Sequence, residues 1–438
     1  MAFANNRGVF ILGSRKALKS AEIAEIKTSA NFCVPLKNGY ASESKPLVVV
    51  GQNVKCGSAL ASPTDNSSAF VYSPVSGNVV AVDKRLNSFG QECIIIEIAP
   101  SLKNTFLYFK PIGEQTKANL FGRLVESGSV DTWGQRFPSY KKYLSANIRK
   151  AQTLVVKLYD SDGFVLSNSV IAKQYPKEIA QGAMLFQRVS NCDEVCFVIG
   201  ASDYNDVSAS VKGELVNLGA DMSRFSFVKA GKKYPSDEEH LLAKNFGRKT
   251  VKIEHNVEDF GVFIESAQTC LNFYNAVYKN EPTISSVYTI SGSTFKAPAV
   301  VNILNGTRAS DVFAKYNIKD KEKFYSYAIG GAMAGVSQMS FDAELPLSQT
   351  SLVSFERKDK EPEMPCINCG KCTKVCPVKL EPMALDLYAE EKDFGRAKKC
   401  GAIACIGCGA CSFVCPAKRN LAQRIGDMKD NIRAGRTM

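Results

Sequence analysis

The chain of 438 residues, 45% of them hydrophobic and 22% charged, has the composition of a folded globular protein, and its length predicts two to four domains. Its 55 Lys and Arg against 43 Asp and Glu give a formal charge of +12. Because no long basic run accompanies this excess, the sequence argues against nucleic-acid binding. The charge fits an acidic protein partner or an anionic membrane surface. The presence of only two histidines argues strongly against a multi-histidine metal site and a His-centred catalytic triad.

The N-terminal sequence, MAFANNRGVFILGSRK, does not resemble a signal peptide. Its apolar run is short, follows Arg7 and precedes no small-residue cleavage site. No stretch of about 18 apolar residues occurs in the sequence, so we expect no transmembrane helix. These features predict a chain without an export signal, whose fifteen cysteines are reduced or bound to metal.

Residues 1–100 predict β structure. Short apolar runs (KPLVVVGQNVKCGSALA, AFVYSPVSGNVVAVDKR and CIIIEIAP) are separated by turn glycines. This pattern resembles the lipoyl-type barrel–sandwich hybrid. The turn at which that fold carries its modified lysine is here Val75-Ser76-Gly77. We therefore expect a docking or packing module instead of a swinging-arm carrier.

Residues 101–255 predict a parallel, doubly wound α/β domain, because buried apolar strands alternate there with helical patterns. Such a sheet binds ligands beyond the carboxyl ends of its strands. The expected strands are 153–160, 194–203 and 225–231, and the expected helices are 168–190 and 207–219.

Two further segments precede the C-terminal region. Residues 256–335 combine short strands with helices and predict a small mixed β domain. Residues 336–363 are polar, show little periodicity and end in FERKDKEPE, so they predict a linker.

Residues 364–438 contain two copies of one cysteine motif. Each copy has the form C-x2-C-x2-C-x3-C-P, the spacing that holds a cubane [4Fe–4S] cluster. Three cysteines of each copy are expected to bind one cluster, and the fourth, beside the proline, to bind the other. A single C-x2-C would fit zinc, but two complete quartets with both prolines favour iron–sulfur clusters. The predicted quartets are Cys366, Cys369, Cys372 with Cys415, and Cys405, Cys408, Cys411 with Cys376.

The remaining cysteines and the basic C-terminus suggest less specific roles. Cys400 lies outside both quartets and is expected as a free thiol, and the six cysteines before residue 300 as buried structural residues. Residues 418–438 carry six Lys and Arg against two Asp. Two interpretations of this segment stay open: a docking helix for an acidic partner or lipid surface, and a solvated tail.

The whole chain resembles the C subunit of the Rnf ion-translocating electron-transport complex, a family related to the flavin-binding NADH subunit of respiratory complex I. The most specific pieces are SPVSGNVVAV, YAIGGAMAG, PCINCGKCTKVCPVKLEPM and CIGCGACSFVCP. The resemblance implies an α/β and α+β multidomain fold. Its expected parts are an N-terminal β barrel–sandwich hybrid, a doubly wound α/β domain, a small mixed β (SLBB-like) domain and a C-terminal two-cluster ferredoxin-like α-helical domain.

In this family, glycine-rich and acidic segments form a site for flavin and NADH, and this chain departs from each of them. Asp237 and Glu238 stand where the family has two glycines, and Arg136 enlarges a loop of small residues. Glycines let backbone N–H groups approach a phosphate, so acidic or bulky replacements block that approach and repel its charge. We therefore expect FMN and NADH to bind weakly or not at all. The residues that the resemblance assigns to this altered pocket are Gly134, Phe137, Asp160, Asp162 and Glu239.

The sequence thus predicts an electron-transfer subunit of a membrane-bound, ion-translocating oxidoreductase, passing single electrons through two [4Fe–4S] clusters. The resemblance implies integral-membrane and flavin-carrying partner subunits, and ferredoxin, flavodoxin or NADH as the soluble carrier. It also implies a peripheral position on the cytoplasmic face of the inner membrane. One alternative is a stand-alone flavin- and NADH-dependent iron–sulfur oxidoreductase similar to a cobalamin reductase, which needs an intact glycine loop. Another is a scaffold with vestigial chemistry, which predicts broken cysteine quartets.

Overall fold

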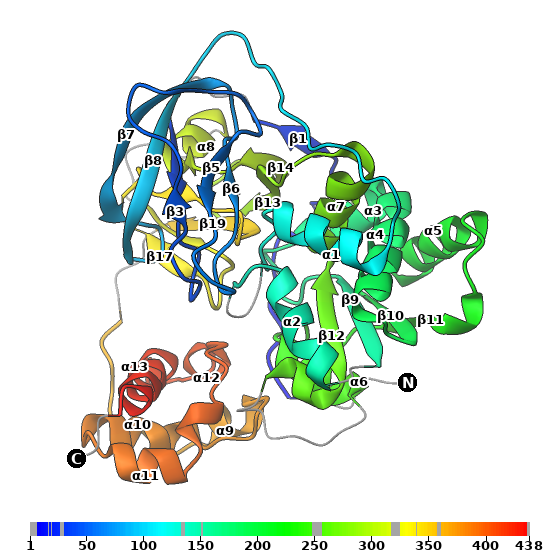
Figure 1. Cartoon of the computed structure of the whole chain (residues 1–438). Helices are drawn as coiled ribbons and strands as arrows, with labels where there is room; N and C mark the ends of the chain where they lie inside the picture. The colour runs from blue at the N-terminus through cyan, green and yellow to red at the C-terminus, as the bar shows by residue number, and fades with distance from the viewer. Residues whose placement is uncertain are drawn as a thin grey trace.

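The chain folds into an N-terminal β structure, a parallel α/β unit, a mixed β-sheet and a C-terminal helical domain, which lies at the base of the molecule in Figure 1. This is the multidomain α/β and α+β architecture that the sequence predicts. None of the helices in the described ranges is long and apolar enough to cross a bilayer. The computed structural model describes residues 7–15, 17–18, 20–26, 30–132, 136–149, 152–247, 256–316, 325–338, 340–356 and 361–435.

The N-terminal strands form two small antiparallel sheets around one apolar core that includes Phe32, Leu60 and Ile96. The turn that would carry a lysine is fixed by the chain itself: Ser76 is only 6% exposed, and its hydroxyl accepts from the Cys56 N–H and donates to the Thr105 carbonyl. The strands are β2 (Phe32–Pro35), β4 (Asn53–Val54), β7 (Gly77–Leu86) and β8 (Glu92–Pro100) in one sheet, and β3 (Lys45–Pro46), β5 (Ala59–Ser62) and β6 (Val71–Tyr72) in the other.

The α/β unit is a four-stranded parallel sheet in the order β11-β10-β9-β12 with helices on both faces. Alternate residues of the central strand point to opposite sides: Leu154 and Val156 pack with one helical layer, while Val155 packs with Leu242 of the other. The strands are β9 (Thr153–Leu158), β10 (Glu194–Ile199), β11 (Phe225–Lys229) and β12 (Val262–Ser266). The helices are α1 (Lys117–Glu126), α2 (Tyr140–Arg149), α3 (Ser167–Gln174), α4 (Pro176–Ser190), α5 (Tyr204–Asn217), α6 (Glu239–Phe246) and α7 (Ala267–Tyr274).

This unit extends beyond the boundary at residue 255 that the sequence suggests. Strand β12 pairs with β9 in parallel, and helix α7, which follows it, packs against α4. A fully buried strand lacks the alternating pattern that marks an exposed sheet, so its membership in one sheet or the next depends on pairing, which the local sequence does not encode.

The mixed sheet has six strands in the order β1-β14-β13-β19-β16-β17. Its edge strand β1 comes from the beginning of the chain and pairs in parallel with β14, with Ile23 opposite Val300. The strands are β1 (Ile23–Glu25), β13 (Ser285–Ser291), β14 (Ala299–Leu304), β16 (Tyr325–Ile329), β17 (Val336–Gln338) and β19 (Ser351–Glu356). Strands β15 (Thr307–Arg308) and β18 (Glu344–Leu345) pair beside it, and helix α8 (Ala309–Lys315) packs on its core.

The expected linker, residues 336–363, is wrong over much of its length. Strand β19 lies inside the mixed sheet, with Leu352 and Val353 fully buried. The polar residues that suggested a linker are buried as well: the Ser354 hydroxyl is 3.1 Å from Thr294 Oγ1 and 3.3 Å from the Ser326 carbonyl. Satisfied hydroxyls let a strand with polar composition occupy a core position.

The C-terminal domain is a set of short helices around Leu385, Ile425 and Met428. Helix α13 packs on α10, and its Arg424 pairs with Asp386 at 2.9 Å, so residues 421–433 are not a solvated tail. The helices are α9 (Lys371–Val375), α10 (Pro382–Glu390), α11 (Phe394–Lys399), α12 (Ala410–Phe413) and α13 (Leu421–Arg433).

Candidate functional site

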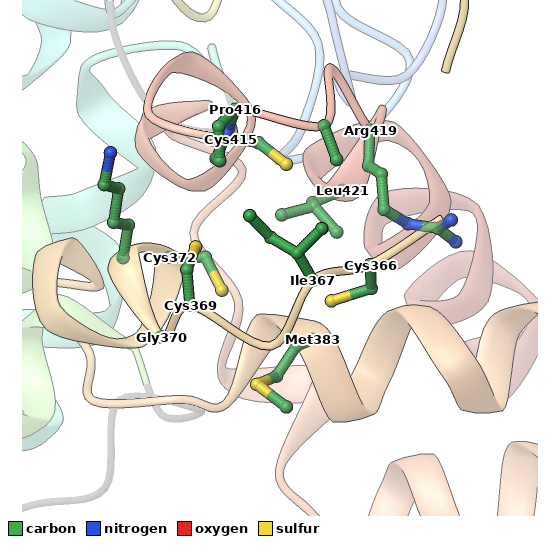
Figure 2. A pocket seen from close by; sticks show the side chains of 12 residues that line it. Cys366, Ile367, Cys369, Gly370, Cys372, Met383, Cys415, Pro416, Arg419 and Leu421 are labelled. Carbon is green, nitrogen blue, oxygen red and sulfur yellow. The ribbon is translucent and has the colours of Figure 1, made fainter. Parts of the chain in front are cut away.

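One pocket of the C-terminal domain is lined by four cysteines from both motif copies. It encloses about 360 Å³ of partly open space, and Figure 2 shows the four sulfurs around it with the Ile367 side chain among them. Apolar side chains of Met383 and Leu421 complete the lining. The four cysteines are Cys366, Cys369, Cys372 and Cys415, the same residues that the motif spacing groups as one quartet.

Left-handed backbone at two residues turns the first motif tightly enough to bring its cysteines together. Asn368 has φ 53° and Gly370 has φ 69°, and α9 begins immediately after Gly370. Cys366 and Cys369 therefore lie on an exposed loop, while Cys372, in the first turn of α9, is buried. Three thiols from seven residues thus reach one pocket, and the fourth comes from beyond α12.

The other four cysteines form a second, less exposed group. Burial raises the pKa of Cys408 to about 12, and the neighbouring thiols of Cys405, Cys411 and Cys376 act in the same direction. Burial likewise raises the pKa of Cys411 to about 12, with Cys405 and Cys376 contributing. These mutual influences place the four thiols of the second predicted quartet close to one another.

The two groups adjoin, and backbone N–H groups point at their sulfurs. Cys372 of the first group and Cys411 of the second pack together with Leu421. The Leu380 N–H donates to Cys376 Sγ at 3.3 Å, and the Gly407 N–H to Cys405 Sγ at 3.4 Å. Soft thiol donors, apolar walls and N–H groups aimed at sulfur are the surroundings that iron–sulfur clusters have in proteins. No three His, Cys, Asp or Glu side chains in the described ranges form a group for a single metal ion.

A second pocket lies between the α/β unit and the mixed sheet, at the carboxyl end of β9. Its lining includes Asp160, Asp162 and Asp237 together with Tyr234 and Gln349. Two of the residues assigned to the altered nucleotide pocket are therefore brought together here.

The carboxylates of this pocket are bound by the chain's own backbone. Asp160 accepts from the Asn168 N–H at 3.0 Å and its side-chain amide at 2.8 Å, and Asp162 accepts from the N–H groups of Phe164 at 3.0 Å and Ala332 at 2.8 Å. Burial raises the pKa of Asp160 to about 6 and also raises the pKa of Asp162.

Asp237 and Glu238, which the resemblance places at two glycine positions of the family, have side chains that bind within the fold. Asp237 accepts from the N–H of Ser161 at 3.0 Å and from its hydroxyl. Glu238 caps helix α6, accepting from the Leu241 N–H at 3.0 Å. The sequence identified these positions as altered but gave no signal for their new partners.

The other residues assigned to the nucleotide pocket lie elsewhere. Phe137 stacks under Lys141, whose Nζ is 3.1 Å from the ring centroid, and does not line the second pocket. Glu239 lies in the first turn of α6 and is likewise not part of that lining. Gly134 lies outside the described residues.

Arg136, from the altered glycine loop, lies beside the second pocket. With the Gln349 amide oriented to accept, Nε and one terminal nitrogen of Arg136 both lie 3.0 Å from its oxygen. The guanidinium also lies 4.9 Å from the centre of the Phe89 ring. The side chain is thus bound to the mixed sheet and to the barrel.

The N-terminal segment covers the acidic turn. Val9 exchanges two backbone hydrogen bonds with Tyr234, at 3.0 and 2.9 Å, and the Ser14 N–H donates to the Gly163 carbonyl at 2.9 Å. Gly13 and Gly163 touch so closely that a Cβ on Gly13 would lie 1.9 Å from the Gly163 oxygen. A Cβ on Gly163 would in turn lie 2.5 Å from the Ile11 carbonyl oxygen, so this close contact requires glycine at both positions.

Tyr234 links the second pocket to the second cysteine group, a contact that the sequence did not predict. Its ring packs in one apolar cluster with Val9, Met333, Cys408 and Ala410. Its side chain is almost fully buried, and its hydroxyl finds no hydrogen-bond partner among the described residues. The second cysteine group therefore faces the interior of the molecule.

Three family models match the chain, in the order that the fold shows. They are the RnfC barrel sandwich hybrid domain over residues 3–101, the Nuo51 FMN-binding domain over residues 124–275 and the 4Fe-4S dicluster domain over residues 365–419. The second match ends beyond β12 and α7, in agreement with their place in the α/β unit.

Curated relatives resemble the chain over most of its length. The C subunit of the ion-translocating oxidoreductase complex of Vibrio cholerae is 25% identical over 84% of this chain and 48% of its own length, so the chain spans about half of that relative. The C subunit of the Na(+)-translocating ferredoxin:NAD(+) oxidoreductase complex of Acetobacterium woodii is 25% identical over 98% of both chains. The chain therefore joins an RnfC-type barrel, a Nuo51-type domain and a 4Fe-4S dicluster domain in one polypeptide, and is a homologue of the C subunits of ion-translocating oxidoreductase complexes.

Proposed function

We propose that this chain is the electron-transfer C subunit of a membrane-bound, ion-translocating oxidoreductase of the Rnf type. The observation that carries the proposal is the pocket lined by Cys366, Cys369, Cys372 and Cys415, with the second cysteine group beside it. Four thiols from two motif copies match the ligand set of a [4Fe–4S] cluster better than that of a single ion.

The residues that would hold the two clusters are the two predicted quartets. A [4Fe–4S] cluster, when bound, takes up and releases one electron at a time. The chain itself contributes in two ways. The N–H groups of Leu380 and Gly407 donate to cysteine sulfurs and lower the negative charge there. The side chains of Ile367 and Met383 limit the access of water to the first pocket. Lys429 donates to the Cys405 carbonyl and places a cation beside the second quartet.

The relatives' names, each that of a subunit of an ion-translocating complex, support a proposal for the partners and the location that the resemblance implies. As the C subunit of such a complex, the chain would work with integral-membrane and flavin-carrying subunits, as a peripheral protein on the cytoplasmic face of the inner membrane. Ferredoxin, flavodoxin or NADH would be the soluble carrier. Fractionation of native cells tests this: the chain should sediment with membranes together with other subunits, and recovery entirely in the soluble fraction without them would contradict it.

We further propose that FMN and NADH bind weakly or not at all, although an FMN-binding domain model matches the chain. Asp160, Asp162 and Asp237 surround the second pocket, and each acid near a diphosphate costs on the order of 1–2 kcal/mol at an effective dielectric near 20. Arg136 is bound to Gln349, and the N-terminal segment covers the acidic turn. The described residues that line the pocket include these three acids and no Lys or Arg side chain to offset their charge.

Anaerobic purification of the full chain tests both parts. We expect about eight irons per chain, a [4Fe–4S] electron paramagnetic resonance signal after dithionite reduction, and no bound flavin. Zinc in place of iron would refute the cluster assignment. Micromolar binding of NADH with rapid bleaching of the clusters would instead support the second candidate, a stand-alone flavin- and NADH-dependent oxidoreductase, which the matched FMN-binding domain favours.

A further inference from the structure

The two cysteine groups have different surroundings. The second group packs against Tyr234 and Met333 inside the molecule, whereas Cys366 and Cys369 of the first are exposed. Between and beside them, Ile367 is 66% exposed and Met364 is 56% exposed. Large apolar side chains exposed next to a redox-active site indicate a surface that another protein covers.

The rim of this surface is positively charged. Lys371 and Lys374 are exposed and three residues apart on α9, so they lie on the same side of that helix, and Lys371 also lines the first pocket. Neither lysine pairs with a carboxylate of the described residues.

The nearby carboxylates, in contrast, are already paired. Glu361 pairs with Lys418 at 3.4 Å, and Glu363 pairs with Arg424. The segments that form this face, residues 361–376 and 415–419, contain four basic and two acidic residues. The two charges of the face that have no partner among the described residues are therefore both positive.

We propose that this outer face, made of Met364, Ile367, Lys371 and Lys374 around the exposed cysteines, docks an acidic protein that carries its own one-electron redox centre. Apolar side chains at the centre with charge at the rim are the usual arrangement of a transient protein interface. The lysines would steer the acidic partner, and Ile367 would form the dry contact. With a [4Fe–4S] cluster bound by the outer quartet (Cys366, Cys369, Cys372 and Cys415), that cluster would accept one electron from the reduced centre of the partner, with no bond made or broken.

This proposal rests on the proposed function, because it assigns the outer quartet as the site that exchanges electrons with the docked partner. It adds that the two quartets act in a fixed order, the outer one toward the partner and the inner one toward Tyr234 and the second pocket. It also accounts for the position of Lys371 and Lys374, whose charges have no partner among the described residues. Both lysines lie beside the exposed thiols and the exposed side chains of Ile367 and Met364.

The test measures binding separately from electron transfer. The iron-loaded full chain is titrated with an oxidised, acidic bacterial ferredoxin by isothermal titration calorimetry, at about 20 mM and about 300 mM salt. The variant Lys371→Glu/Lys374→Glu is compared with a control of equal charge change, Lys398→Glu/Lys399→Glu, whose lysines are exposed on α11 of the same domain. A third variant, Ile367→Ser, tests the apolar contact.

We expect the Lys371/Lys374 variant to bind at least tenfold more weakly than wild type at low salt, and the control to stay within about twofold. High salt should reduce the difference for the lysine variant but leave the loss in Ile367→Ser unchanged. Iron content and the dithionite-reduced spectrum are measured for every variant, and affinities are compared only between samples of equal iron content.

Three results would overturn the proposal: equal affinities in both lysine variants, binding of anionic phosphatidylglycerol vesicles but not ferredoxin through these lysines, or burial of this face in a dimer of the chain. A wild-type chain without iron would refute the proposed function instead. Binding is measured with the oxidised partner, so the titration reports docking without electron transfer. A failure of the docking proposal can therefore be distinguished from a failure of the cluster assignment.

Discussion

Lys142 is buried between two carboxylates and joins α2 to β12. Its Nζ lies 3.0 Å from Asp131 Oδ1 and 3.4 Å from Glu265 Oε1, and it donates to the Ile264 carbonyl at 2.6 Å. The Tyr143 hydroxyl donates to the same Glu265 oxygen at 2.8 Å. Burial opposes the charge of Lys142, but Asp131 and Glu265 outweigh it and raise the pKa of the ammonium group. The cluster holds two acids and one base in the core.

Replacing Lys142 by methionine should leave the Asp131 and Glu265 side chains buried without the ammonium group that both contact. We expect the free energy of unfolding of the α/β unit to fall by about 3–5 kcal/mol in urea denaturation. Lys212→Met, at an exposed lysine of α5, should change it by less than about 0.5 kcal/mol. Equal stability of the two variants would show that Lys142 is not needed as a charge.

Asp131 should make stability depend on pH in a specific direction. Burial raises its pKa, against the pull of Lys142, so the folded chain holds this proton more tightly than the unfolded chain. The contribution of such a carboxyl is most favourable below its ordinary pKa, near 4, and becomes less favourable as pH rises toward the raised value. Asp131→Asn removes this loss, so the stability of the variant relative to wild type should increase from pH 5 to pH 8. A difference that shrinks over this range would contradict the assignment.

At the scale of the elements, the loop before α9 and its first turn build one cysteine group. Cys372→Ser should lower the iron content from about eight to about four per chain, because one cluster loses a thiolate ligand and the hydroxyl that replaces it is a poorer ligand for iron in such a cluster. Cys400→Ser, an exposed cysteine outside both groups, is the matched control and should leave the iron content unchanged. Colorimetric iron analysis of anaerobic samples measures both.

Asp386 connects three elements of the C-terminal domain. This buried carboxylate of α10 pairs with Arg419, from the segment after the second motif, and with Arg424 of α13 at 2.9 Å. Asp386→Asn should destabilise this domain by about 1.5–3 kcal/mol, the range for hydrogen bonds to charged groups. Glu391→Gln, which breaks an exposed pair with Arg396, should cost about 0–1 kcal/mol. Thermal unfolding followed through the cluster absorbance compares them.

The loops around the cysteines could be predicted from the sequence, whereas pairings between distant segments could not. The cysteine motifs are local, since fixed spacings and left-handed residues determine the loops, and their pocket has the predicted four cysteines. Strand β19 was missed because the polar Ser354 is buried with partners that only the folded sheet supplies. The contact of Tyr234 with Cys408 joins residues far apart in the chain, and no local pattern encodes it.

At the scale of the whole molecule, the N-terminal segment connects the α/β unit with the C-terminal domain. Val9 is buried with Tyr234 on one side and Ala410 on the other, and Arg7 donates to the Thr373 carbonyl at 3.2 Å. Val9→Asp should therefore increase hydrogen exchange in residues 231–236 and 408–414, because a buried charge would separate these surfaces. Leu12→Asp, at a side chain that is fully exposed nearby, should leave both segments protected. Unchanged exchange in the Val9 variant would show that the domains are held together elsewhere.

Strand β1 has a consequence for synthesis of the chain. Glu25 bonds to Asn302, 277 residues later, so at about 5–20 residues per second β1 waits roughly 14–55 s for its neighbour to leave the ribosome. The barrel after it has its own core and can close during this time, but the mixed sheet cannot be completed until β19 has emerged. A nascent chain stalled before residue 299 would hold β1 without its partner strand, and during that pause a chaperone has its clearest opportunity to bind.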